Sequence, residues 1–131
     1  MKALIADNDT AVRTLTGLLL RDAGFDETIQ ARNGREAFAL LKNESADFII
    51  SDWSLAEMDG LSLLKACKRD PMLKNIPFVM SSGNSDSSEM RQALEAGADA
   101  YVIKPFLFSE LQDTLSKVRL KIGRKLVLLP L

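Results

Sequence analysis

Short apolar runs alternate along the chain with longer segments whose apolar residues recur at helical spacing. Five strands are expected, at residues 2–6, 28–31, 47–51, 77–81 and 100–103. Five helices are expected between and after them, at residues 10–23, 34–42, 61–69, 87–96 and 107–122. The apolar stripe of the first helix consists of Val12, Leu15, Leu18 and Leu19. The predicted order is a strand followed by a helix, repeated five times.

The strands are too apolar for a sheet with one face in water. The runs at 48–50 and 78–80 are apolar throughout rather than alternating, and the connections between elements are short. Both features favour a parallel sheet covered by helices on both faces. We therefore predict an α/β fold, a (βα)5 doubly wound three-layer sandwich that forms one domain over residues 1–122.

Polar residues with a shared chemistry directly follow the apolar runs, and in such sheets ligands bind beyond the carboxyl ends of the strands. They are Asp7, Asn8, Asp9, Asp52, Ser82 and Lys104. Carboxylates suit Mg²⁺, and a carboxylate near that metal can attack phosphorus and become an acyl phosphate. A lysine and a hydroxyl would stabilise the transferring group. Each residue alone is more often a helix cap, a turn residue or a solvated side chain, but their joint occurrence after four strands indicates phosphoryl chemistry.

Composition excludes several functional classes. The net charge of −1 gives no electrostatic reason to bind nucleic acid or an anionic membrane. The chain has no histidine, which excludes histidine triads and histidine-ligated metals. Its single cysteine, Cys67, excludes an internal disulfide and is expected to be a buried structural thiol. No apolar run approaches the roughly 20 residues that span a bilayer. A strand that begins at Lys2 leaves no room for a signal peptide, so the cytoplasm is the expected location.

Three stretches resemble the receiver domain of bacterial response regulators, and CheY-like (chemotaxis-type) receivers in particular. They are DFIISDWSLAEMDGLSLLK from residue 47, SSG from residue 81 and YVIKPF from residue 101. The spacings also match, with 45 residues from Asp7 to Asp52, 30 from Asp52 to Ser82 and 22 from Ser82 to Lys104. The resemblance runs from Lys2 to about residue 122. It implies a flavodoxin-like sheet of strand order 2-1-3-4-5 and a role in a two-component phosphorelay.

The resemblance also implies roles for individual residues. Asp52 corresponds to the aspartate that receives a phosphoryl group from a sensor histidine kinase, a phosphotransfer protein or a small phosphodonor. Mg²⁺, or Mn²⁺, would be held by Asp7, Asn8, Asp52 and the backbone carbonyl of Ser54. Beyond its own phosphorylation and dephosphorylation, such a chain is a switch rather than an enzyme.

Four further residues correspond to the switching parts of a receiver. Lys104 resembles the lysine that pairs with the bound phosphoryl group, and Pro105 the proline whose preceding peptide bond is usually cis. Ser82 resembles the switch hydroxyl, and Tyr101 the aromatic residue that rotates inward with it. A phosphoryl group adds about −1.5 to −2 charge. It would bias a surface made by the fourth helix, fifth strand and fifth helix, which an output partner or domain would read.

The sequence departs from the family pattern at Asn8, in the 56–60 loop and in its tail. Asn8 stands where the family most often has a second acidic metal ligand, so metal affinity is expected to fall. Asp9 would compensate if the loop bent inward; alternatively, Asp9 or Thr10 caps the first helix. Ala56 replaces a common proline, which predicts a less rigid loop. Residues 123–131, GRKLVLLPL, are a truncated linker, a segment folded back on the body or a docking peptide.

Two other functions fit parts of the sequence. The segment ADNDT at 6–10 also fits the D-x-D-x-T opening of haloacid dehalogenase-type phosphatases, with Asp7 as nucleophile and Asp9 as acid/base. That family needs a further acidic motif and a longer core, and it does not explain the position of Asp52. The second alternative, supported by Asn8 alone, is a receiver-like interaction module that signals without phosphorylation. A flavin-binding version of the fold lacks the phosphate loop after the first strand.

Overall fold

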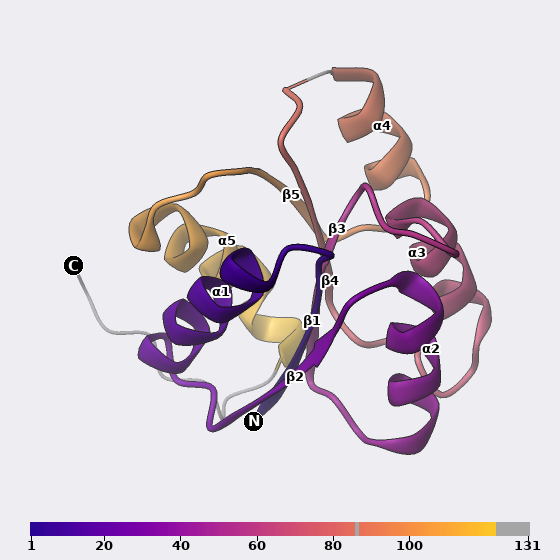
Figure 1. The fold of residues 1–131 in the computed structure, drawn as a ribbon, viewed down its shortest axis with the longest axis horizontal. Coiled ribbons are helices and arrows are strands. Elements are labelled where there is room, and N and C mark those ends of the chain that lie inside the picture. The colour runs from indigo at the N-terminus through magenta and orange to yellow at the C-terminus, as the bar shows by residue number, and fades with distance from the viewer. Residues whose placement is uncertain (86, 123–131) are drawn as a thin grey trace.

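The computed structural model describes residues 1–85 and 87–122, and Figure 1 shows their arrangement. The strands are β1 (Lys2–Ala6), β2 (Glu27–Ala31), β3 (Phe48–Asp52), β4 (Phe78–Ser82) and β5 (Ala100–Ile103). The helices are α1 (Thr10–Asp22), α2 (Gly34–Asn43), α3 (Gly60–Arg69), α4 (Ser87–Glu95) and α5 (Phe108–Ile122). The predicted elements are all present, with ends that differ by at most one residue. The predictions for 123–131 lie outside the described residues.

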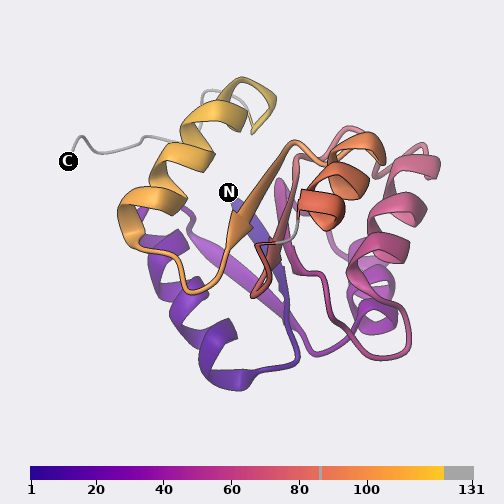
Figure 2. The same ribbon diagram turned by 90° about the horizontal axis from the view of Figure 1, so that it is seen from above.

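The five strands form one parallel sheet of order β2-β1-β3-β4-β5, as predicted. Helices α1 and α5 cover one face, and α2, α3 and α4 cover the other (Figures 1 and 2). The chain runs from β1 to β2 on one side of β1, and then from β2 to β3 on the other side of β1. The crevice of a doubly wound sheet lies where the order reverses in this way, so the carboxyl ends of β1 and β3 flank it.

The core consists of two apolar clusters, one on each face of the sheet. Leu4 and Phe78 belong to the cluster under α2, α3 and α4, whereas Ile5 and Ile50 belong to the cluster under α1 and α5. Neighbouring strand residues point to opposite faces, which explains why continuous apolar runs are needed here. Cys67 lies in the first cluster, and burial raises the pKa of its thiol to about 12. The prediction of a buried structural thiol is confirmed.

The predicted apolar stripe of α1 is wrong for two of its members. Leu15 and Leu18 are 56% and 57% exposed. The residues that face the sheet instead are Arg13, Thr16, Gly17 and Leu20. A Cβ atom at Gly17 would lie 3.6 Å from Cδ1 of Ile5, so the small residues let the helix approach the sheet closely. Close approach and hydrogen bonding therefore decide which face of this helix is buried, even though larger apolar side chains lie on the exposed face.

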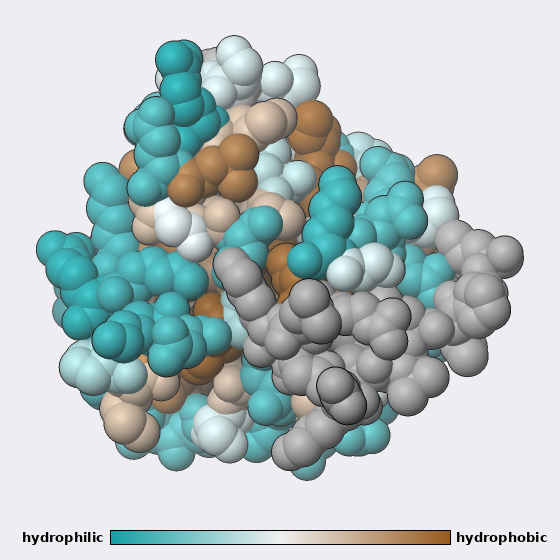
Figure 3. Space-filling model, turned by 180° about the vertical axis from the view of Figure 1, so that it is seen from behind, coloured by the Kyte–Doolittle hydropathy of each residue, from teal (hydrophilic) through white to brown (hydrophobic). Residues whose placement is uncertain are grey.

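The surface is mixed in polarity. On the side shown in Figure 3, hydrophilic residues predominate in the described part, and apolar residues appear in separate patches. Large apolar side chains that are exposed include Met72 at 80% and Leu107 at 68%. None of the described helices is long and apolar enough to cross a membrane.

Gly60 holds the start of α3 against the end of β3. Its N–H donates to the carbonyl of Trp53 at 2.9 Å. A Cβ atom at this position would lie 2.2 Å from the carbonyl oxygen of Asp52 and 3.0 Å from Sδ of Met80. The backbone of Asp52 is therefore fixed by a contact that has room for glycine alone.

Replacing Gly60 with alanine is expected to destabilise the protein, because the methyl group would meet backbone that cannot move away. The expected loss is about 1–3 kcal/mol or more in the free energy of unfolding. Gly17→Ala is the matched control. It adds a methyl group with only ordinary contacts inside a helix and is expected to gain about 0.5–1 kcal/mol. Urea unfolding followed by the fluorescence of Trp53 measures both, and equal stability of the two variants would contradict the proposed contact.

Candidate phosphoryl-acceptor site

Three charged side chains from three strands meet at the carboxyl edge of the sheet. Asp7 directly follows β1, Asp52 is the last residue of β3, and Lys104 directly follows β5. The ammonium of Lys104 donates to Oδ2 of Asp7 at 2.9 Å and lies 3.1 Å from Oδ2 of Asp52. One cation therefore bridges two carboxylates that are distant in sequence.

Burial strengthens the electrostatic coupling in this cluster, since Asp7 and Asp52 are only 3% and 6% exposed. Burial raises the pKa of the Asp52 carboxyl above its ordinary value. The charge of Lys104 opposes that shift, and the negative charge of Asp7 adds to it. Burial alone would lower the pKa of Lys104, but its hydrogen bond to Asp7 and the charges of both carboxylates outweigh burial and raise it.

The backbone of Lys104 is tied to the neighbouring strand. Its N–H donates to the carbonyl of Ser82 at 2.7 Å, which ties the end of β5 to the end of β4. The peptide bond between Lys104 and Pro105 is cis. Residues that follow three different strands are thus held at one place by the sheet itself.

The β1–α1 turn places its three polar residues differently. Asp7 points into the cluster, and its Oδ1 accepts the N–H of Asp9 at 2.9 Å. Asp9 is the N-cap of α1, since its Oδ1 accepts the N–H groups of Ala11 and Val12. The capping prediction is confirmed for Asp9, and its alternative role as an inward metal ligand is not adopted. Asn8 is exposed between the two aspartates.

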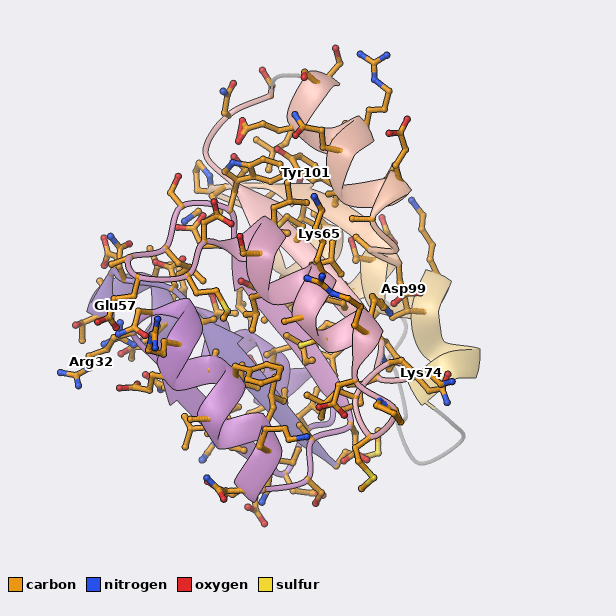
Figure 4. The ribbon with its side chains drawn as sticks, turned by 90° about the vertical axis from the view of Figure 1, so that its right-hand side faces the viewer. Arg32, Glu57, Lys65, Lys74, Asp99 and Tyr101 are labelled. Atoms are coloured by element: carbon orange, nitrogen blue, oxygen red, sulfur yellow. The ribbon has the colours of Figure 1, made fainter. Side chains whose placement is uncertain are left out.

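Ser82 and Tyr101 are linked through Asn84. The hydroxyl of Ser82 accepts the N–H of Asn84 at 3.0 Å, and the hydroxyl of Tyr101 donates to the carbonyl of Asn84 at 3.0 Å. Figure 4 shows Tyr101 on the side of the sheet that α3 and α4 cover, where it packs against the core of that face. The sequence did not single out Asn84, because its contacts depend on the path of the loop backbone.

The donor atoms at this edge suit a hard divalent cation. Asp7 and Asp52 provide buried carboxylates, and the backbone N–H of Ser54 contacts the carboxylate of Asp52. The exposed Asn8 is the next residue after Asp7 in the chain. Mg²⁺ prefers one or two carboxylates, completed by water and phosphate oxygens. In the described part of the chain, no three Asp, Glu, Cys or His side chains gather into a metal site. Two carboxylates meet the need of Mg²⁺ without such a cage.

Comparison with known proteins identifies the family. The response regulator receiver domain matches residues 3–116. The chain belongs to this family. The receiver is 36% identical over 118 residues to chemotaxis protein CheY-3 of Vibrio cholerae, which covers 90% of this chain and 91% of that protein.

Solved structures agree with this assignment. Chemotaxis response regulator CheY4 of Vibrio cholerae superimposes with a TM-score of 0.82 at 31% identity, covering 89% of this receiver and 97% of that chain. The signal receiver domain of a histidine kinase from Syntrophus aciditrophicus superimposes with a TM-score of 0.83 at 29% identity and covers 98% and 97%. The fold, the response-regulator family and the similarity to CheY proteins are as predicted.

The structure brings together Asp7, Asp52 and Lys104, with Ser82 one hydrogen bond away through the Lys104 backbone. Tyr101 stands apart from this cluster and is linked to Ser82 through Asn84. Sequence reasoning missed Arg13, whose guanidinium donates to the carbonyl of Asp7 at 2.6 Å. The available signal was the spacing of Arg13 with Thr16, Gly17 and Leu20, which places it on the buried side of α1.

The pKa of Asp52 provides a test of this cluster. Since its folded pKa is raised, Asp52 stays protonated to a higher pH than in the unfolded chain, and its ionisation in the folded state costs stability as pH rises through that pKa. Lys104→Met should raise the pKa of Asp52 further, and Asp7→Asn should lower it. Carbon-detected NMR of the Asp52 carboxyl, titrated with pH, measures both shifts.

Asp70 is the matched control for this titration. Its pKa is lowered by a hydrogen bond from Lys42 at the surface. Lys42→Met should raise the pKa of Asp70 and leave that of Asp52 unchanged, since the two pairs lie at different places in the fold. An Asp52 pKa that does not respond to Lys104→Met would contradict the bridging arrangement.

Proposed function

We propose that this receiver accepts a phosphoryl group on Asp52 and acts as a phosphorylation switch in two-component signalling. The observation that carries the proposal is the cluster of Asp7, Asp52 and Lys104 at the switch point of the sheet. It combines a carboxylate nucleophile with a cation already placed beside the atom that would react. The receiver family generally acts as a signalling switch rather than as an enzyme with turnover.

In the proposed reaction, an Oδ atom of Asp52 attacks the phosphorus of the donor. The bond from phosphorus to the donor's leaving atom breaks, and that atom keeps the electron pair, so Asp52 becomes an acyl phosphate. Attack requires the ionised carboxylate. Lys104 pairs with Asp52 before the reaction, and its ammonium can turn to a phosphoryl oxygen afterwards.

Mg²⁺, or Mn²⁺, is the proposed metal. When bound, it neutralises charge on the transferring phosphoryl group. The residues proposed to hold it are Asp7, Asp52, Asn8 and Ser54, the last through its backbone carbonyl. Asp7 is already oriented by the N–H of Asp9 and by Lys104, so the side chain need not be ordered when the cation arrives.

The proposed switch runs from Ser82 to the surface of α4, β5 and α5. A phosphoryl group on Asp52 offers oxygen acceptors to the Ser82 hydroxyl, which now accepts from the N–H of Asn84. A move of that hydroxyl would break this hydrogen bond to Asn84, whose carbonyl accepts from the hydroxyl of Tyr101. The output partner or domain would read the changed surface around Tyr101, as in other loop-based switches.

A sensor histidine kinase or a phosphotransfer protein is the proposed phosphodonor. We assign its approach to an apolar hollow of about 270 Å³ beside the pocket, because Lys104 itself forms part of the wall. The residues that line the hollow are Val12, Leu15, Thr16, Lys104, Pro105 and Phe106. The exposed Leu15 of α1 is thus part of a surface next to the reacting groups.

Incubation with acetyl phosphate and Mg²⁺ is expected to add the mass of one phosphoryl group to the intact chain. Asp52→Asn should abolish the addition, because a neutral amide cannot replace the ionised carboxylate as the nucleophile. Intact-mass spectrometry measures it, and beryllofluoride binding serves as the control for rapid hydrolysis. A wild-type chain with neither adduct nor beryllofluoride binding would favour the receiver-like module that signals without phosphorylation.

Asn8→Asp is expected to lower the Mg²⁺ concentration that half-saturates phosphorylation. A restored carboxylate at an exposed position is worth about 1–2 kcal/mol of attraction to a divalent cation, or roughly five- to thirtyfold in affinity. Asn43→Asp, at the exposed end of α2, is the matched control and should leave the half-saturating Mg²⁺ concentration unchanged. An unchanged Mg²⁺ requirement in Asn8→Asp would remove Asn8 from the metal site.

A further inference from the structure

Arg13 is a buried cation close to the pocket that the proposed reaction does not use. It is the fourth residue of α1 and is only 7% exposed. Among residues 1–85 and 87–118, whose side chains are described, it is the one lysine or arginine that is buried. Burying a guanidinium is costly unless its donors are satisfied, so its partners indicate why it is retained.

The guanidinium of Arg13 joins the two ends of the β1–α1 turn. Its Nη1 donates to the main-chain carbonyl of Asp7 at 2.6 Å, and its Nη2 donates to Oγ1 of Thr10 at 3.1 Å. Asp7 is the first residue after β1, and Thr10 is the first residue of α1. One side chain therefore spans the turn that carries Asp7, Asn8 and Asp9.

Each polar group of Asp7 consequently has a fixed partner. Its N–H donates to the carbonyl of Ala31 at 3.1 Å, and its carbonyl accepts from Arg13. Its Oδ1 accepts from Asp9 and its Oδ2 from Lys104. The main chain is held on both sides of the Asp7 Cα atom, so the direction of the carboxylate is set before any ligand binds.

Arg13 contacts the carbonyl of Asp7 rather than its carboxylate, and this choice matters for a cation. A guanidinium paired with the carboxylate would compete for the oxygens that a metal needs. Bound to the carbonyl, it orders the residue and leaves the outer lone pairs of the carboxylate available. The arrangement resembles the outer hydrogen bonds that orient metal ligands in other proteins.

The acidic residue Glu36 of α2 is bonded to Arg32, and the charge of Arg13 acts on it more weakly. The carboxylate of Glu36 accepts from the backbone N–H of Arg32 at 3.0 Å and from its guanidinium at 3.2 Å. The backbone hydrogen bond from Arg32 lowers the pKa of Glu36 most, and the charges of Arg32 and Arg13 lower it further. Arg32 itself is 73% exposed and points outward in Figure 4. The charge of Arg13 therefore lowers the pKa of Glu36, while the carboxylate of Glu36 stays bonded to Arg32.

We infer that Arg13 is a positioning residue for the metal side of the pocket, acting through the main chain of Asp7. The inference rests on the proposed function, because it concerns the Mg²⁺ that phosphorylation would need. A purely structural Arg13 would fill space between α1 and the sheet with its aliphatic stem and would affect stability alone. A positioning Arg13 affects metal affinity in the folded protein.

The test measures Mg²⁺ binding to the full chain without any phosphodonor. The fluorescence of Trp53, adjacent to Asp52, and titration calorimetry give the dissociation constant, and urea unfolding gives stability separately. Arg13→Met keeps the length and apolar stem of the side chain but loses both hydrogen bonds. It should weaken Mg²⁺ binding about 10- to 100-fold while the protein remains folded. Arg21→Met, at an exposed position in the last turn of α1, is the matched control and should bind as the wild type does.

Two further variants keep the test decisive. Arg13→Lys retains the charge but not the two-pronged hydrogen bonding of the guanidinium. It should recover part of the lost affinity, because an ammonium can reach the Asp7 carbonyl but not Thr10 at the same time. Thr10→Ala removes the weaker of the two contacts and should weaken binding less than Arg13→Met. If Arg13→Met does not fold, these two variants decide the question.

The outcomes separate this inference from the proposed function. If the wild-type chain and the Arg13→Met variant bind Mg²⁺ equally well, the positioning role is overturned and the proposed function is left intact. A wild-type chain that binds neither Mg²⁺ nor Mn²⁺ would overturn the metal site and the positioning role together. Faster amide exchange at Asp9 in metal-free Arg13→Met, with unchanged exchange in Arg21→Met, would support the loosened turn independently of binding.

Discussion

The ammonium of Lys104 lies between two buried carboxylates, and the arrangement of the whole site depends on this ion cluster. Neighbouring strands lie about 4.8 Å apart, so residues at the ends of β1 and β3 are forced close together. Burial is the main cause of the raised pKa of Asp52, and the repulsion between the two carboxylates adds to it. In the sheet, β3 and β4 lie between β5 and β1, the strand that Asp7 follows. Only a long side chain at the end of β5 can reach both carboxylates, which explains why lysine suits this position.

The cluster contains two carboxylates and one ammonium, so one negative charge remains uncompensated when all three groups are ionised. This excess is what a second cation would neutralise, and it connects the electrostatics of the resting protein with the proposed metal. Asn8 limits the excess, because an acidic residue there would add another charge next to Asp7. If Asn8 holds the metal as proposed, its amide lowers the affinity for the cation and also lowers the repulsion within the metal-free pocket. Arg13 fits the same logic, since it orders Asp7 from the carbonyl side without occupying its carboxylate.

Much of the fold could be predicted from the sequence because buried parallel strands leave a strong signal. Continuous apolar runs such as residues 48–50, with Asp52 at the end of the same strand, predicted both the sheet and its functional edge. The stripe of α1 was harder to predict, because Leu15 and Leu18 outweigh Thr16 and Gly17 in any hydrophobicity pattern. What decides that face is close packing at Gly17 and the hydrogen bonds of Arg13, and neither is a property of apolar spacing. The role of Asn84 was out of reach, since it uses main-chain atoms that any residue possesses.

The path from the pocket to Tyr101 also passes through main-chain atoms. The N–H of Asn84 binds the hydroxyl of Ser82, and the carbonyl of the same residue accepts from Tyr101. Ser82 and Tyr101 therefore need no direct contact to influence each other. In the proposed switch, a Ser82 hydroxyl that turns toward a phosphoryl group gives up its contact with the N–H of Asn84. The carbonyl that holds Tyr101 belongs to the same residue, so the proposed motion at Ser82 would reach the α4–β5 surface through one loop residue.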